Sequence, residues 1–211
     1  MKTSSDIGSP RISIIIPAFN EETLIGVTLS AIQEALKEEE ESYEIIVVDD
    51  GSVDNTADVA RKAGAQVITH ERNLGYGKSL LSGFKQARGD IIVFFEANLS
   101  FNPQDIKKLI KNVEEADLTI GSRYIQSAKK SQIPFYKALI SKIRALMIYF
   151  STSVKVTDPD SGFRAIHKKK LGRLHLESKD FSINYEMIAK AAKMGFKISE
   201  VPVLYREWWK D

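Results

Sequence analysis

The sequence predicts an α/β fold in which a mostly parallel, doubly wound sheet is flanked by helices. Short apolar runs alternate with longer amphipathic segments along most of the chain, which is the pattern of repeated strand and helix units. Several runs end abruptly in polar residues, as residues 91–95 do at Glu96. The chain has 211 residues, 43% of them hydrophobic, and no internal repeat. We therefore expect one large domain with a substantial core.

The predicted strands are apolar runs that are too short for most helices. They are residues 12–16, 45–48, 66–69, 91–95, 118–120 and 197–205. The predicted helices have apolar residues at helical spacing, and several begin at a capping residue or end at a glycine. They are residues 21–36, 54–62, 75–87, 105–115, 136–150 and 184–194. Residues 158–164, which mix carboxylates, a hydroxyl and a cation, are expected to form a loop.

The composition limits the chemistry that the protein can perform. The chain has no cysteine, which excludes disulfides, thiolate metal sites and a cysteine nucleophile, and which fits a cytoplasmic setting. Residues 1–10 are polar, so we interpret them as a flexible leader and not as a secretion signal. No run approaches the roughly 20 apolar residues that a membrane-spanning helix needs.

Positive charge is concentrated in one region, although the net charge is only +2. Residues 123–173 contain twelve Lys or Arg and two acidic residues, which indicates an anionic partner for this region. Within it, residues 136–150 place an apolar stripe on one side of the predicted helix and basic residues on the other. Such a helix either lies on a membrane surface or packs on the sheet, and the sequence leaves both open.

Oxygen-bearing side chains follow three of the predicted strands. Residues 17–21 follow the first strand, residues 49–52 the second, and Glu96, Asn98 and Ser100 the fourth. The carboxyl ends of parallel strands line one crevice, in which ligands bind. Carboxylates there suit ribose hydroxyls and base N–H groups, and clustered oxygens suit a divalent cation that carries a phosphate. Each motif alone is also typical of a turn or a helix cap, so the prediction rests on their joint occurrence.

These residues resemble a known family, the inverting glycosyltransferases of family 2, which have the GT-A nucleotide-sugar-binding fold. Within that family they are most similar to the dolichol- and polyprenyl-phosphate mannose or glucose synthases. The matching segments occur in the order of the family and cover almost the whole chain. They are residues 14–22, 44–52, 73–78, 89–90, 121–123, 158–164 and 200–203.

The resemblance implies transfer of a sugar, with inversion, from a UDP- or GDP-linked donor to a polyprenyl phosphate. It implies a nucleotide-sugar half at residues 11–121 and an acceptor half at residues 122–211. The nucleotide sugar would be bound by Pro17, Phe19, Glu21, Val48, Asp50, Glu96, Ala97, Asn98, Arg123 and Arg206. The acceptor phosphate would be bound by Arg123, Lys137 and Ser141, and the catalytic residues would be Asp158, Arg123 and Arg164. The expected location is the cytoplasmic face of the membrane, with the protein held peripherally at the membrane surface and no nucleic-acid partner.

The expected cofactor is Mg²⁺ or Mn²⁺, with Glu96, Asn98 and Ser100 as its ligands. Here the sequence departs from the family, which has an Asp-x-Asp motif at the end of the fourth strand. This chain has Glu96, Ala97 and Asn98 instead, and the amide of Asn98 keeps an oxygen but loses a charge. A weakened metal site, another cation preference and an inactive relative all remain open.

Two other functions therefore remain open beside the lipid-phosphate transferase. One is a catalytically silent nucleotide-sugar-binding protein, for which the altered motif is the support. The other is a transferase that acts on saccharide hydroxyls, which requires a general base, for which Asp158 or Asp160 is the candidate. A phosphate acceptor needs no such base, because it is already an anion at neutral pH. The identities of the donor base and the sugar are not predicted.

Overall fold

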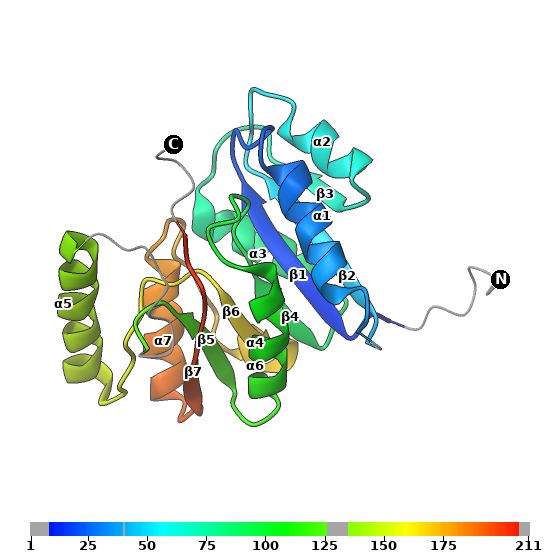
Figure 1. Cartoon of the computed structure of the whole chain (residues 1–211). Helices are drawn as coiled ribbons and strands as arrows, with labels where there is room; N and C mark the ends of the chain where they lie inside the picture. Colours follow the sequence, from blue (N-terminus) through cyan, green and yellow to red (C-terminus); the bar gives the residue numbers. More distant parts are fainter. Residues whose placement is uncertain (1–8, 40, 126–134, 207–211) are drawn as a thin grey trace.

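A computed structural model describes residues 9–39, 41–125 and 135–206. It confirms the predicted α/β fold, with one seven-stranded sheet in the order β3-β2-β1-β4-β6-β5-β7 (Figure 1). The strands are β1 (Ile12–Ala18), β2 (Tyr43–Asp49), β3 (Gln66–Thr69), β4 (Ile91–Phe94), β5 (Leu118–Ser122), β6 (Arg164–His167) and β7 (Ile198–Pro202). The α-helices are α1 (Ile25–Leu36), α2 (Thr56–Lys62), α3 (Tyr76–Gln86), α4 (Ile106–Val113), α5 (Phe135–Thr152), α6 (Lys168–Arg173) and α7 (Ile183–Lys193). A 3₁₀ turn, η1 (Pro103–Asp105), precedes α4.

The first four strands are parallel, and their register brings their carboxyl ends to one edge of the sheet. Ile14 of β1 pairs with Ile45 of β2 on one side and with Val93 of β4 on the other. Because every crossover between these strands passes through a helix, the segments that follow β1, β2 and β4 meet at the same edge. That edge is where the sequence analysis placed the ligand crevice.

The strand β6 was not predicted. It lies between β4 and β5 and is antiparallel to both, with Val93 paired to Ala165 and Thr119 also paired to Ala165. Its sequence gives little signal, because the polar residues Arg164 and His167 enclose an apolar run of only two residues. The short helix α6 follows it and was missed as well, whereas β7 is shorter than the predicted strand at residues 197–205.

The helices cover the two faces of the sheet, and each face has its own core. One face packs against α1 and α4 through residues such as Leu29 and Leu109. The opposite face packs against α3, α6 and α7 through residues such as Leu80, Leu171 and Met187. The sheet is therefore covered on both sides, which explains why its central strands are continuous apolar runs.

Helix α5 stands at one side of the molecule, beside α7 (Figure 1). The face that it turns inward includes Ser141 and Ile148, which are 1% and 8% exposed. The apolar stripe predicted from the sequence faces outward instead, and its residues Met147 and Phe150 are 66% and 78% exposed. The stripe therefore does not pack on the sheet. It forms a large apolar surface that has no partner among the described residues.

The packing of α3 on the sheet gives a stability prediction. A methyl group at Gly83 would stand 2.4 Å from Ile15 Cγ2 and 3.2 Å from Val48 Cγ2. Replacing Gly83 by Ala should therefore lower the free energy of unfolding by about 1–3 kcal/mol, because the core has no room for the added methyl group. The matched control is Gly172→Ala on α6, where the nearest atom would be 3.7 Å away. Urea unfolding that gives both variants the same midpoint would contradict this account of the packing.

Candidate active site

The segments after β1 and β2 are tied together at the carboxyl edge of the sheet. The backbone N–H of Asn20 donates to Ser52 Oγ at 2.9 Å, and the N–H of Val53 donates to Asn20 Oδ1, also at 2.9 Å. Asn20 has a φ of +54°, which turns the chain sharply after the strand. Phe19 is left 44% exposed beside this junction, and Glu21 is half-buried. The two motifs therefore meet, as the sequence predicted.

Asp50 is engaged in holding the turn before α3. Its Oδ1 accepts hydrogen bonds from His70 Nδ1 at 2.6 Å and from Leu74 N at 2.9 Å, and its Oδ2 accepts one from Gly75 N at 2.8 Å. Burial alone would raise the pKa of Asp50, but these hydrogen bonds outweigh burial and lower it. Asp50 thus fixes the entrance of α3 next to the crevice. The side chain of Val48, another predicted nucleotide-binding residue, lies entirely in the core.

Glu96 follows β4 and lies deeper in the crevice, half-buried beside Gly162 and the Tyr76 hydroxyl. The pKa of Glu96 is raised to about 7, chiefly by burial; the Arg123 cation opposes this rise, and the carboxylates of Asp158 and Glu21 add to it. A carboxyl group with this pKa changes its charge near neutral pH. Its environment is therefore the electrostatic centre of the crevice.

The three predicted metal ligands lie on one short segment, but they do not form a ready cation cage. Asn98 Oδ1 accepts a hydrogen bond from Ser100 N at 3.1 Å, and Ser100 itself is buried. Among the residues that the structure describes, no three His, Cys, Asp or Glu side chains are grouped so that they could hold a metal ion. The Glu96 carboxylate nevertheless fits a cation, because its ionised form is disfavoured by burial and by two neighbouring carboxylates. Asn98 could add one neutral oxygen.

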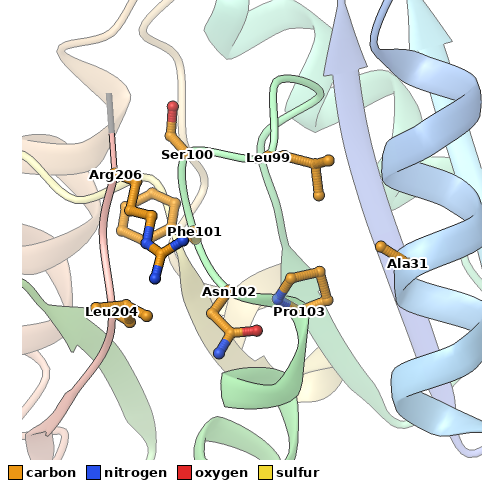
Figure 2. A pocket seen from close by; sticks show the side chains of 8 residues that line it. All are labelled: Ala31, Leu99, Ser100, Phe101, Asn102, Pro103, Leu204 and Arg206. Atoms are coloured by element: carbon orange, nitrogen blue, oxygen red, sulfur yellow. The ribbon is translucent and has the colours of Figure 1, made fainter. Parts of the chain in front are cut away.

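Arg206 lies beside the same segment. Its backbone N–H donates to Ser100 O at 2.9 Å, and Asn102 N donates to Leu204 O at 3.1 Å, so the chain after β7 runs along residues 99–103. Figure 2 shows the Arg206 side chain pointing into a cavity of about 300 Å³, with Ala31 of α1 on its far side. The structure thus brings Arg206 next to the loop that carries Asn98.

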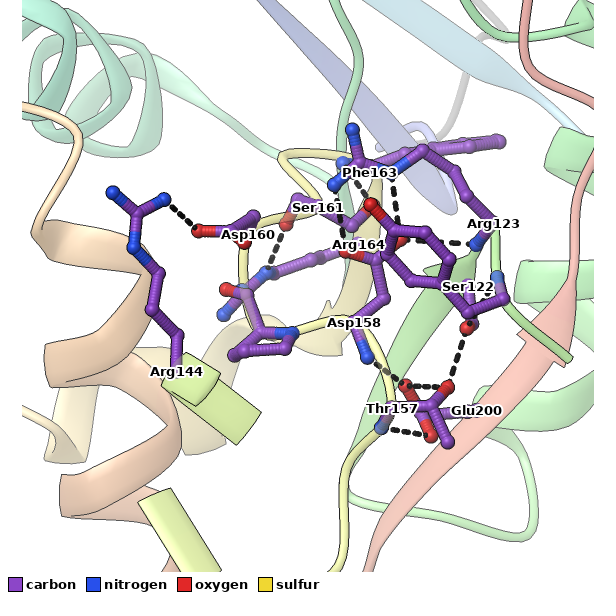
Figure 3. A network of polar contacts seen from close by, with 12 residues as sticks. Ser122, Arg123, Arg144, Thr157, Asp158, Asp160, Ser161, Phe163, Arg164 and Glu200 are labelled. Atoms are coloured by element: carbon purple, nitrogen blue, oxygen red, sulfur yellow. Dashed lines mark hydrogen bonds and ion pairs between the residues drawn. The ribbon is translucent and has the colours of Figure 1, made fainter. Parts of the chain in front are cut away.

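A loop at residues 157–164, which we call the acidic loop, leads into β6 and carries a network of polar contacts (Figure 3). Asp158 has no exposed surface, and its Oδ2 and Oδ1 accept hydrogen bonds at 2.7 Å from Arg123 Nε and Nη2, respectively. The backbone N–H of Arg123 also donates to Asp158 Oδ2, at 2.9 Å. Burial would lower the pKa of Arg123, but the hydrogen bonds and charge of Asp158 raise it. This bidentate pair fixes the guanidinium and leaves its Nη1 group outside the contact with Asp158.

Glu200 of β7 holds the acidic loop from below. Its Oε1 accepts hydrogen bonds from Asp158 N at 2.9 Å and Thr157 Oγ1 at 3.1 Å, and its Oε2 accepts one from Thr157 N at 2.8 Å. The sequence analysis gave no role to Glu200. Glu200 stands between Ser199 and Val201, and this local sequence gives no signal of its contacts with residues 157 and 158.

Arg164 was predicted to be catalytic, but the structure places its side chain wholly inside the protein. Its guanidinium donates to three backbone carbonyls, those of Ser161 at 2.8 Å, Asn184 at 2.6 Å and Pro159 at 2.8 Å. Burial lowers the pKa of Arg164 to about 10. In this arrangement Arg164 shapes the acidic loop and does not reach the crevice.

Two predicted acceptor residues belong to α5. Ser141 is buried, and its hydroxyl interacts with the side chains of Tyr124 and Asp160. The side chain of Lys137 lies outside the described residues. Tyr124, directly after Arg123, stands between the crevice and α5, where it lines a second cavity of about 570 Å³ together with Ala138, Ala145 and other residues. That cavity was not foreseen from the sequence.

The fold and this crevice define the class of α/β proteins that bind ligands at the carboxyl edge of a parallel sheet. The chain matches the family model of glycosyl transferase family 2 over residues 13–174. It therefore belongs to that family, as the resemblance of its motifs predicted.

Similar proteins support the same family, and two of those described next have assigned functions. The chain is 35% identical to the dolichol-phosphate mannosyltransferase of Pyrococcus furiosus, over 92% of this chain and 56% of that protein. It is 31% identical to the undecaprenyl-phosphate mannosyltransferase of Micrococcus luteus, over 93% of this chain and 84% of that protein. It is also 35% identical to an uncharacterized protein of Methanocaldococcus jannaschii, over 97% of this chain and 86% of that protein.

Solved structures confirm the GT-A fold. The glucosyl-3-phosphoglycerate synthase of Mycobacterium tuberculosis matches the chain with a TM-score of 0.72 at 21% identity, over 94% of this chain and 72% of that one. Other structures of that synthase contain UDP with Mn²⁺ or with Mg²⁺. At least one protein with this fold therefore binds UDP together with a divalent cation.

The charges around Glu96 give a prediction that needs no substrate. In the folded protein the Glu96 carboxyl should titrate near pH 7, which ¹³C NMR of labelled glutamate can measure. Replacing Arg123 by Gln should raise that pKa by roughly 1, because the opposing cation is lost. The control is Arg88→Gln, which removes a cation that pairs with Glu44. This variant should leave the pKa of Glu96 unchanged. A Glu96 pKa near 4.5 in the unmodified protein would refute the account of its burial.

Proposed function

We propose that this protein transfers a sugar, with inversion, from a nucleotide sugar to a polyprenyl phosphate. The observation that carries the proposal is the position of Arg123, which is fixed by Asp158 at the crevice while α5 exposes large apolar side chains nearby. A phosphate-binding cation beside a lipid-facing helix suits an amphiphilic phosphate. The relatives from Pyrococcus furiosus and Micrococcus luteus, which act on dolichol phosphate and undecaprenyl phosphate, support the same acceptor class.

The reaction that we propose is a direct displacement at the anomeric carbon by an oxygen of the lipid phosphate. The C–O bond to the new phosphate forms as the bond to the nucleoside diphosphate breaks, and the leaving group carries away the electron pair. The phosphate is already anionic, so alignment and charge control replace a general base. This fits the contacts of Asp158, whose two carboxylate oxygens both accept hydrogen bonds from Arg123. Arg123 would hold the acceptor phosphate, and Arg206 would approach the departing diphosphate.

We assign residues 11–121 to the donor and residues 122–211 to the acceptor. Pro17, Phe19, Glu21 and Asp50 would surround the nucleoside, and the backbone at Val48 and Ala97 would complete its site. Glu96 and Asn98 would hold Mg²⁺ or Mn²⁺, with Ser100 supporting Asn98 through its backbone N–H. When bound, the cation would neutralise charge on the diphosphate.

The lipid part of the acceptor would lie against α5. The cavity of about 570 Å³ between α5 and residues 155–157 is lined mainly by apolar groups, including Ala138, Ala145, Tyr149 and Val156. It lies next to Tyr124, and therefore next to Arg123, so an isoprenoid chain could enter it while its phosphate stays at the guanidinium. Among the described residues, no helix is long and apolar enough to cross a membrane. We propose that α5 attaches the protein to the cytoplasmic membrane surface.

The test is a transfer assay with purified protein, Mn²⁺, undecaprenyl phosphate in vesicles, and radiolabelled UDP-glucose or GDP-mannose. The proposal predicts label in the organic phase with at least one donor, and loss of that label when EDTA is added. Binding of the donor without any turnover would favour the silent sugar-nucleotide-binding protein instead. The pair Glu96 and Asn98, which lacks the charge of a second carboxylate, is the observation that keeps this second candidate in view.

The proposed role of Arg123 predicts a large kinetic effect. Arg123→Gln should lower kcat/KM for the lipid phosphate by about 100-fold or more, because a fixed cation at the reacting phosphate is removed. Arg88→Gln is the control, since Arg88 pairs with Glu44 at the other end of β2. Equal rates in the two variants would exclude Arg123 from the acceptor site.

The proposed lipid cavity predicts a selective effect on the acceptor. Ala145→Trp should fill the cavity and raise KM for undecaprenyl phosphate by roughly 10-fold or more, without changing the affinity for the nucleotide. Ser30→Trp, at an exposed position on α1 that does not line this cavity, is the control. Unchanged KM in Ala145→Trp would place the isoprenoid chain elsewhere.

A further inference from the structure

Asp160 joins the acidic loop to two helices. Its Oδ1 accepts a hydrogen bond from Arg144 Nη1 of α5 at 2.8 Å and another from the Tyr185 hydroxyl of α7. The Arg144 guanidinium also lies 5.9 Å from the centre of the Tyr185 ring. Burial would raise the pKa of Asp160, but the Tyr185 and Ser141 hydroxyls and the Arg144 charge outweigh burial and lower it. Asp160 is therefore a charged junction between α5, α7 and the loop.

Asp160 lies two residues after Asp158 in the sequence, so this junction is close to the ion pair between Asp158 and Arg123. Figure 3 shows Arg144 reaching Asp160 from one side of the loop, while Asp158 and Arg123 lie on the other side. Between them, Arg164 holds the carbonyls of Pro159 and Ser161, so the loop moves as a unit rather than as separate residues. A displacement of Asp160 would therefore be carried to Asp158.

Helix α5 is the element most open to displacement. Its inward face is narrow, with Ser141 and Ile148 buried, whereas Leu139, Ile143, Met147 and other large apolar side chains are about half exposed or more. Among the described residues, α7 is the main element that contacts α5, and entry of the exposed face into a bilayer would add further contacts. Any interaction that favours one orientation of α5 also favours the loop arrangement that belongs to it.

We infer that Arg144, Asp160 and Tyr185 are positioning residues that couple the seating of α5 on a membrane to the geometry of Asp158 and Arg123. The inference rests on the proposed function and adds to it a means by which the bilayer, and not only the lipid acceptor, organises the active site. None of the three residues needs to touch the substrate for this role. They act by linking a lipid-facing helix to the loop that aims the Arg123 guanidinium.

Hydrogen–deuterium exchange of the acidic loop tests this coupling without catalysis. Vesicles of phosphatidylcholine and phosphatidylglycerol, with no acceptor lipid, should slow exchange of residues 157–164 by at least about fivefold in the unmodified protein. Arg144→Gln, Asp160→Asn and Tyr185→Phe should bind the same vesicles but lose this slowing. Lys169→Gln, which removes an exposed charge on α6, is the control and should keep it.

The combined variant makes the test sharper. If Arg144 and Asp160 act through one contact, the double variant Arg144→Gln/Asp160→Asn should lose no more of the vesicle effect than either single variant. The inference is overturned if vesicles fail to bind or fail to slow exchange in the unmodified protein. It is also overturned if the three single variants respond to vesicles as Lys169→Gln does.

Catalysis supplies a second readout. With geranyl phosphate as a water-soluble acceptor, acceptor-free vesicles should raise kcat of the unmodified protein by about fivefold or more, and should not raise it in Tyr185→Phe. Transfer that is insensitive to vesicles would refute the coupling and leave the proposed function intact. No transfer under any condition would refute the proposed function, while the exchange experiment would still decide the coupling.

Discussion

The ion pair between Asp158 and Arg123 is the contact on which the rest of the site depends. Asp158 has no exposed surface, and a carboxylate in such a place requires both a cation and hydrogen-bond donors. Arg123 supplies the cation and three donors, counting its backbone N–H. Loss of either partner leaves the other uncompensated, which in proteins typically costs about 3–5 kcal/mol. The geometry of the crevice and the stability of the acidic loop therefore both depend on the ion pair between Asp158 and Arg123.

Other features of the fold serve to bring this pair to the crevice. Arg123 follows directly after β5, and Asp158 precedes β6, which lies beside β5 in the sheet. Because β6 is antiparallel to β4, with Arg164 paired to Phe94, it begins at the carboxyl edge of the parallel strands, and the acidic loop before it therefore lies near Glu96. Glu200 and Arg164 then hold the backbone of the loop between them. The strand that the sequence analysis missed is thus the one that completes the site.

The elements that could be predicted are those whose signal lies in a few consecutive residues of the sequence. Buried strands and their polar ends could be located because the apolar runs at residues 12–16, 45–48 and 91–95 are continuous and end sharply. The strand β6 was not predictable, because its length and its flanking Arg164 and His167 mask it. The direction of the apolar stripe on α5 could not be predicted either, since an amphipathic pattern does not say whether the apolar side faces protein or membrane.

The residues of the candidate site also divide into those that the sequence indicates and those that only the structure reveals. Glu96 could be proposed because it follows a predicted strand and such residues share one edge of the sheet, whereas Asp158 and Arg123 were proposed from the family resemblance. The roles of Glu200 and Tyr185 depend on contacts 42 and 25 residues away in sequence, which no periodicity reveals. The raised pKa of Glu96 likewise results from burial and from carboxylates on two other segments, those of Asp158 and Glu21. Arg164 was named for its charge, but only its three carbonyl partners reveal that it is a structural residue.

A crystal structure of the protein with UDP or GDP, Mn²⁺ and geranyl phosphate would test the central claim most directly. The account predicts that the geranyl phosphate group lies within about 3 Å of the Arg123 guanidinium, with the Asp158 contact intact. Its isoprenoid chain should point toward α5. A phosphate bound away from Arg123, or an Arg123 side chain that leaves Asp158 when the ligands bind, would contradict the account.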